Sequence, residues 1–176
     1  MGNNWKITDT LTKVFADEVP DGQGSIRLST LHRETVSCVI AYFGAADWGR
    51  YWKVSVKAPE KIETRLRRVE LVPSAYPCHK EQDDNYLRIV PGMYPDLLRD
   101  LNTEGDGADK KYLTKEVPGQ WRSLWLDVTV DAELAGGDYA IVIETETEDG
   151  EKETLKADLH VVDASLPPQK LLHTEW

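Results

Sequence analysis

The chain has 176 residues, of which 40% are hydrophobic and 30% are charged, and its formal net charge is −10. This composition is typical of one folded domain and excludes wholesale disorder. A negative surface repels phosphate backbones and anionic lipids, so neither nucleic acid nor a membrane is expected as a partner. The N-terminal residues lack the apolar stretch of a secretory signal, so we expect a cytoplasmic protein.

Apolar and polar residues alternate with a period of two, which predicts β-strands along most of the chain. In chain order, the expected strands cover residues 26–28, 36–43, 51–58, 67–72, 124–131, 139–145 and 155–162. Turn sequences at 136–138 and 148–150 separate the last three strands, which we expect to form a meander. The acidic run from 144 to 153 is expected to be a solvated hairpin tip. The pattern favours an all-β, immunoglobulin-like antiparallel β-sandwich.

Residues 76–118 are expected to form one long irregular loop, because they contain several prolines, glycines and charges. A single helical turn is expected over 96–101, after Pro95. At the other end, Pro167 and Pro168 stop the last strand. We therefore expect a sandwich domain over 1–165 and a linker over 166–176. The apolar residues of that linker are expected to be buried by a following domain; they are Leu171, Leu172 and Trp176.

The residues that usually carry chemistry do not gather in this sequence. The histidines are scattered, at positions 32, 79, 160 and 173, so no metal site is expected. No phosphate-binding loop or nucleophile motif is present, and the adjacent pair Asp83 and Asp84 is not expected to be catalytic. We therefore predict no catalytic residue and no cofactor. Cys38 is expected in the core and Cys78 in a loop, and whether they pair stays open.

The tryptophans and tyrosines give more information. Trp52 is in phase with Val54 and is expected in the core, whereas Trp48 and Tyr51 are candidates for contact with carbohydrate, because sugar rings stack on aromatic faces. Trp121 and Trp125 lie on the polar side of their expected strand. That side is therefore expected to be covered, either by the long loop or by another domain.

Three stretches carry a resemblance to a known family. Residues 121–139 resemble a strand, turn and Gly-x-Tyr signature of immunoglobulin-like accessory domains, in which Tyr139 would form a tyrosine corner. Residues 86–98 look like the Pro-Gly-x-Tyr-Pro-Asp-x-Leu loop of glycoside hydrolase family 123-type proteins. Residues 161–168 look like the exit from the N-terminal sandwich of that family.

The resemblance implies a non-catalytic N-terminal domain that precedes a (β/α)8 barrel in the same parent chain. The barrel would carry the Asp-Glu pair of an N-acetyl-hexosaminidase-like enzyme, so no catalytic residue can be assigned in this sequence. The domain would dock on the barrel and shape the rim of the sugar cleft. The expected docking residues are those of the linker together with Pro91, Gly92, Tyr94, Pro95 and Asp96. Two alternatives remain, an autonomous carbohydrate-binding module and a protein-interaction sandwich.

Overall fold

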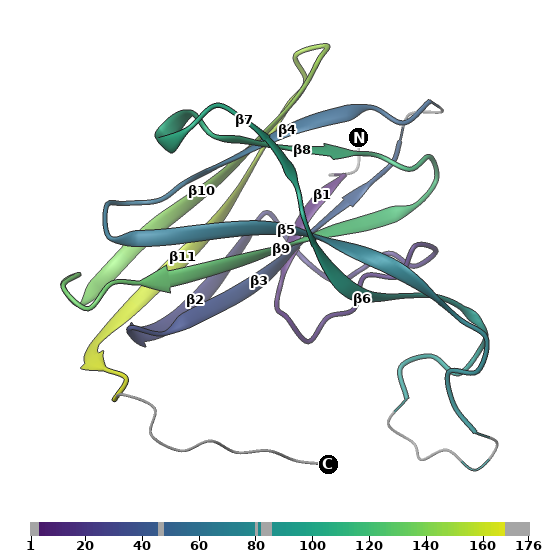
Figure 1. Ribbon diagram of the computed structural model, residues 1–176, viewed down its shortest axis with the longest axis horizontal. Helices are drawn as coiled ribbons and strands as arrows, with labels where there is room; N and C mark the ends of the chain where they lie inside the picture. The colour runs from purple at the N-terminus through teal and green to yellow at the C-terminus, as the bar shows by residue number, and fades with distance from the viewer. Residues whose placement is uncertain (1–3, 46–47, 80, 82–85, 168–176) are drawn as a thin grey trace.

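The computed structural model describes residues 4–45, 48–79, 81 and 86–167. They form two β-sheets that pack face to face (Figure 1), with a single short 3-10 helix (Gly107–Asp109) in the described part of the chain. The five-stranded sheet contains, in spatial order, β1 (Trp5–Thr8), β3 (Thr35–Phe43), β9 (Trp121–Val130), β5 (Ile62–Ser74) and β6 (Gly92–Asp100). The six-stranded sheet contains, in spatial order, β2 (Ser25–His32), β11 (Lys152–Ser165), β10 (Gly137–Thr147), β4 (Tyr51–Lys57), β8 (Lys111–Lys115) and β7 (Asn102–Glu104).

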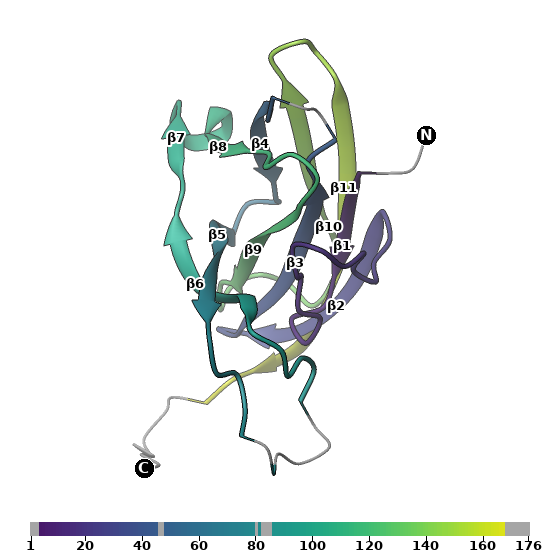
Figure 2. The ribbon, with the colours of Figure 1, turned by 90° about the vertical axis from the view of Figure 1, so that its right-hand side faces the viewer.

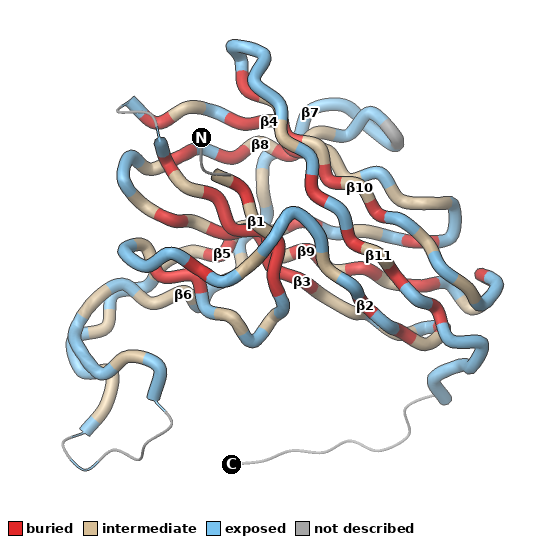
Figure 3. Tube along the Cα trace, turned by 180° about the vertical axis from the view of Figure 1, so that it is seen from behind, coloured by how far each residue is buried: buried red, intermediate tan, exposed pale blue. Residues whose placement is uncertain are grey.

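The core lies between the two sheets and follows the predicted alternation. On β9, Leu124, Leu126 and Val128 are fully buried, and Ile141 and Ile143 face them from β10 in the other sheet. This arrangement confirms the predicted β-sandwich. Most neighbouring strands are antiparallel, and β2 and β11 form a parallel pair. Figure 3 shows buried segments recurring along the strands of both sheets.

Several local predictions are also confirmed. Trp52 is buried in the core, as is Cys38, and both cysteines are free thiols. The Tyr139 hydroxyl donates a 2.7 Å hydrogen bond to the carbonyl oxygen of Ala135, which is the bond of a tyrosine corner. The acidic run ends in an exposed hairpin tip between β10 and β11, where Gly150 has a φ of 81°.

The predicted meander is wrong in its first half. Strands β10 and β11 form a hairpin, but β9 pairs with β3 and β5 in the other sheet. The connection over residues 131–136 therefore crosses from one sheet to the other. A period of two shows which side chains face the core, but it does not show which strand lies alongside.

The predicted irregular loop is shorter than expected. Strands β6, β7 and β8 lie within residues 76–118; β5 ends at Ser74 and β6 begins at Gly92. The predicted helical turn after Pro95 is wrong, because residues 96–100 belong to β6. Pro95 is tolerated in this strand because β6 is the edge of its sheet. A bulge at Asp96 further disturbs the alternation of side chains, because Glu70 and Leu71 of β5 pair with Leu97 and Pro95 and leave Asp96 unpaired.

The cover over Trp121 and Trp125 comes from the connection between β1 and β2, residues 9–24. Val14 packs with Trp121 on the outer face of the five-stranded sheet. The backbone N–H of Trp121 donates to the carbonyl oxygen of Ala16 at 2.9 Å. We expected the long loop or another domain to cover this side, and that expectation is wrong for Trp121. A segment close in space, but distant in sequence, fills the role.

In the part of the chain that the structure describes, no helix is long and apolar enough to cross a membrane. Within the same described residues, no three His, Cys, Asp or Glu side chains gather as metal ligands would.

Candidate docking surface

Strands β5 and β6 continue past the rest of their sheet as a two-stranded extension, which we define as the described residues 71–79, 81 and 86–97. Strand β5 pairs with β9 only as far as Val69 and Ser123, whereas it pairs with β6 as far as Ser74 and Gly92. Beyond that point the hairpin has no third strand. In Figure 1 the described part of the extension projects from the sandwich at the lower right, and β11 ends at the lower left, at the other end of the long axis. Figure 2 shows the extension below the sandwich.

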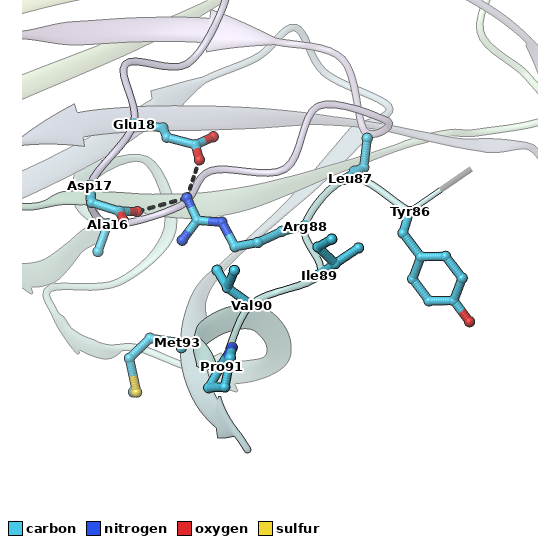
Figure 4. Close-up of a pocket in the computed structure, with 11 residues that line it drawn as sticks. Ala16, Asp17, Glu18, Tyr86, Leu87, Arg88, Ile89, Val90, Pro91 and Met93 are labelled. Atoms are coloured by element: carbon cyan, nitrogen blue, oxygen red, sulfur yellow. Dashed lines mark hydrogen bonds and ion pairs between the residues drawn. The ribbon is translucent and has the colours of Figure 1, made fainter. Parts of the chain in front are cut away.

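Arg88 fastens the extension to the connection over residues 9–24. Its Nη2 donates to Asp17 Oδ1 at 2.8 Å and also bonds Glu18. The guanidinium carbon lies 3.9 Å from the centre of the Phe15 ring, a cation–π contact. The hydrogen bond from Arg88 lowers the pKa of Asp17. Figure 4 shows Arg88 reaching between the two carboxylates.

Tyr94 fixes the extension from within. Its hydroxyl donates to the carbonyl oxygen of Val90 at 2.5 Å and approaches that of Arg88 at 3.3 Å. Its ring meets Phe15 edge to face, with ring centres 5.7 Å apart. Phe15 is buried between this ring and the Arg88 guanidinium. The described part of the extension is therefore held by contacts with residues 15–18 and by hydrogen bonds within the extension itself.

The extension nevertheless exposes many large apolar side chains. Leu87 is 73% exposed and Val90 is 56% exposed. The other exposed apolar residues of the extension are Val72, Tyr76, Tyr86, Ile89, Met93 and Leu97. Residues 16–18 and 86–93 line an open hollow of about 600 Å³ (Figure 4). Contiguous apolar exposure of this kind is typical of surfaces that bind another protein surface.

The predicted docking residues fall into two groups. Gly92, Tyr94, Pro95 and Asp96 lie together on β6, and Pro91 lies immediately before that strand. Pro95 and Asp96 also line a smaller hollow of about 230 Å³ on the outer face of the five-stranded sheet. The other predicted docking residues, Leu171, Leu172 and Trp176, lie outside the described residues, as do Asp83 and Asp84.

The residues that hold this surface in place are not apparent from the sequence. Arg88 interrupts the apolar run over 86–90, and a single charge among apolar residues was the available signal. Its partners Phe15, Asp17 and Glu18 lie about seventy positions earlier, and no local pattern connects them.

The predicted carbohydrate residues lie elsewhere, beside the start of β4 in the six-stranded sheet. Trp48 is 63% exposed and Tyr51 is 52% exposed, whereas Trp52 is turned into the core. The ammonium nitrogen of Lys115 lies 4.9 Å from the centre of the Tyr51 ring. Trp48 therefore offers the more open ring of the two.

Comparison with known proteins supports the fold. No family model and no curated protein matches the chain. A solved structure of a family 123 glycoside hydrolase from Clostridium perfringens, studied for glycolipid glycan hydrolysis, aligns with a TM-score of 0.61 at 9% identity. That alignment covers 93% of this chain but only 28% of the enzyme.

Two further structures align more loosely. The N-terminal domain of PorA has a TM-score of 0.44 at 9% identity, over 92% of this chain and 99% of that domain. A PapD-like domain of human CEP192 has a TM-score of 0.40 at 11% identity, over 94% of this chain and 92% of that domain. At these identities the likeness concerns the fold alone. The chain is an immunoglobulin-like β-sandwich with a distant structural resemblance to part of a family 123 glycoside hydrolase.

Proposed function

We propose that this chain is a non-catalytic N-terminal accessory domain of a glycoside hydrolase-like protein, and that it docks through the β5–β6 extension on a catalytic (β/α)8 barrel. The sandwich would span residues 1–165 and the linker residues 166–176. The barrel would follow in the same parent chain, and the docked extension would shape the rim of its sugar cleft.

The observation that carries the proposal is an apolar extension held in a defined position. If the extension faced only water, polar side chains would be expected at its exposed positions. Instead, Leu87 and Val90 are exposed while the neighbouring Arg88 is clamped by Asp17 and Glu18. Fixing a surface before association reduces the conformational entropy that binding must overcome.

One further observation supports the choice of partner. The structural likeness to a family 123 glycoside hydrolase covers 28% of that enzyme, which leaves room for a further domain.

The test is association between this domain and the segment that follows it, produced as two separate chains. We expect a complex by size-exclusion chromatography and a measurable dissociation constant by calorimetry. Ile89→Asp should weaken the complex at least about tenfold, because a buried unpaired carboxylate opposes association. Tyr51→Asp is the matched control, since Ile89 and Tyr51 are 50% and 52% exposed and Tyr51 lies on β4 of the six-stranded sheet, away from the extension. Absence of any complex would contradict the proposal, as would equal weakening by both variants.

Carbohydrate binding is a second candidate function, and the exposed ring of Trp48 is the observation that favours it. Neutral oligosaccharides should then quench or shift tryptophan fluorescence in a saturable titration. Trp48→Ala should abolish that signal, while Ile89→Asp should leave it unchanged. A flat titration across a panel of glycans would eliminate this candidate and leave the docking proposal untouched.

A further inference from the structure

A cluster of arginines lies at the root of the extension, on the face of the sheet that looks into the sandwich. Arg68 on β5 is paired with the buried core residue Leu124 on one side and with Arg99 of β6 on the other. Arg122 of β9 is paired with the buried Tyr42 of β3. Strand register therefore places side chains from three strands at one spot.

All three guanidinium groups share one carboxylate, that of Glu70. Arg68 donates to Glu70 Oε1 through Nε at 2.9 Å and through Nη2 at 2.5 Å. Arg99 Nε lies 3.5 Å from Oε1, and Arg122 Nη2 lies 3.5 Å from Oε2. Among the described residues, no other acidic side chain forms an ion pair with these arginines. Three cations facing one anion leave two positive charges in excess, in a chain whose net charge is −10.

The cluster also has hydrogen-bond donors without acceptors. Within the described part of the chain, Arg99 and Arg122 make ion pairs with Glu70 but no hydrogen bond through their guanidinium groups. The Arg122 side chain is only 16% exposed, yet none of its nitrogens is among the fully buried atoms that lack a partner. Its donors therefore remain reachable from solvent while most of the side chain is enclosed.

Stability alone does not account for this arrangement. One arginine is enough to neutralise one carboxylate, and Arg68 already donates two hydrogen bonds to Glu70, both to Oε1. Each additional guanidinium beside it adds repulsion between like charges and leaves donors unfilled. An anion with several oxygens would remove both costs, because it would neutralise the excess charge and accept the free N–H groups.

We propose that Arg68, Arg99 and Arg122 form a binding site for a small oxyanion, a sulfate, phosphate or carboxylate group. Glu70 holds Arg68 in its orientation, and Arg122 and Arg99 supply the open donors. The site is separate from the docking surface and does not depend on the proposed function. It faces the interior side of the sheet, whereas Arg88 and Phe15 fasten the extension against residues 9–24 on the outer side.

The test is titration of the domain with sodium sulfate, sodium phosphate and sodium acetate, each at an ionic strength held constant with chloride. Backbone amide shifts followed by NMR should move saturably around Arg68 and Arg122 with at least one of these anions. A preference for sulfate or phosphate indicates a tetrahedral ligand, and a preference for acetate indicates a carboxylate ligand. Linear shifts that chloride reproduces would overturn the proposal.

Arginine variants give the decisive comparison. Arg122→Gln should weaken anion binding at least about tenfold, because it removes a charge and the least exposed donors. Arg99→Gln should weaken it by a smaller factor; its side chain is 62% exposed, so the fold should not depend on it. Arg65→Gln is the matched control, since Arg65 pairs with Asp100 at 2.9 Å on the same sheet and makes no contact with Glu70. Loss of binding in the control, or unchanged binding in Arg122→Gln, would refute the site.

Discussion

Glu116 is a buried carboxylate whose removal should destabilise the fold more than any surface charge would. Its side chain has no exposed surface, and its Oε1 accepts a 2.7 Å hydrogen bond from Trp52 Nε1. Arg50 Nη2 lies 3.6 Å from the same oxygen. The second oxygen, Oε2, is fully buried and has no partner among the described residues.

The expected cost of Glu116→Ala follows from the groups that lose a partner. A buried N–H without an acceptor costs about 1–3 kcal/mol, and Trp52 Nε1 would become one. Breaking a buried ion pair on one side costs about 3–5 kcal/mol. Arg50 retains its bond to Glu151, so the full second figure does not apply. We therefore expect a loss of about 3 kcal/mol in the free energy of unfolding.

Urea unfolding followed by tryptophan fluorescence measures this loss. Glu116→Gln keeps an acceptor for Trp52 and loses only the charge, so it should cost about 1 kcal/mol. Glu151→Ala is the control, because Glu151 is 61% exposed and should contribute less than about 1 kcal/mol. The reasoning would fail if Glu116→Ala had the same free energy of unfolding as Glu151→Ala. It would also fail if Glu116→Met were more stable than the parent, because the buried carboxylate would then destabilise the fold.

Three further outcomes are expected. Tyr139→Phe should lower the free energy of unfolding by about 1 kcal/mol in urea, with an unchanged m-value, because one hydrogen bond is lost. Burial opposes ionisation of Asp127, but hydrogen bonds to it, including one from Arg67, lower its pKa below the ordinary value of 3.8. Its contribution to the free energy of unfolding is therefore complete above about pH 4 and is lost as the pH falls through the lowered pKa. When the free energy of unfolding is measured against pH, Asp127→Asn should show a smaller decrease in acid than the parent. An equal decrease in both proteins would contradict the prediction. Burial raises the pKa of the Cys38 thiol to about 12, so a thiol reagent should label Cys78 in the native state and Cys38 only after unfolding.

The central strands could be predicted because their inward residues form an uninterrupted apolar series. Leu124, Leu126 and Val128 face the core at every second position, and no proline or charge interrupts them. Strand β6 could not be recognised in this way, because Pro95 and a bulge break its alternation at a sheet edge. The pairing of strands could not be predicted either, since the alternation of apolar and polar residues carries no information about which strands are neighbours.

The two candidate sites also differ in how far the sequence alone identifies their residues. The run from Pro91 to Asp96 was singled out from its sequence, and the structure places these residues together because they are consecutive. The arginine cluster is different, since Arg68, Arg99 and Arg122 come from three strands that are distant in sequence. Only the register of β5 against β6 and β9 brings them to one carboxylate. Such a cluster can be found only once the pairing of strands is known.

The two proposed sites lie on different parts of the β5–β6 hairpin, and this makes the two proposals separable. The hollow of the docking surface is lined mainly by residues 86–93, whereas Arg68 and Glu70 lie on β5 before the bulge and face the other sheet. Ile89→Asp changes the charge of the extension without touching any ligand of the anion site. Arg122→Gln changes the anion site without altering any residue that lines the hollow of the extension. If either variant abolished both activities, the extension and the arginine cluster would have to be one functional unit, and bound anion would then be expected to strengthen docking.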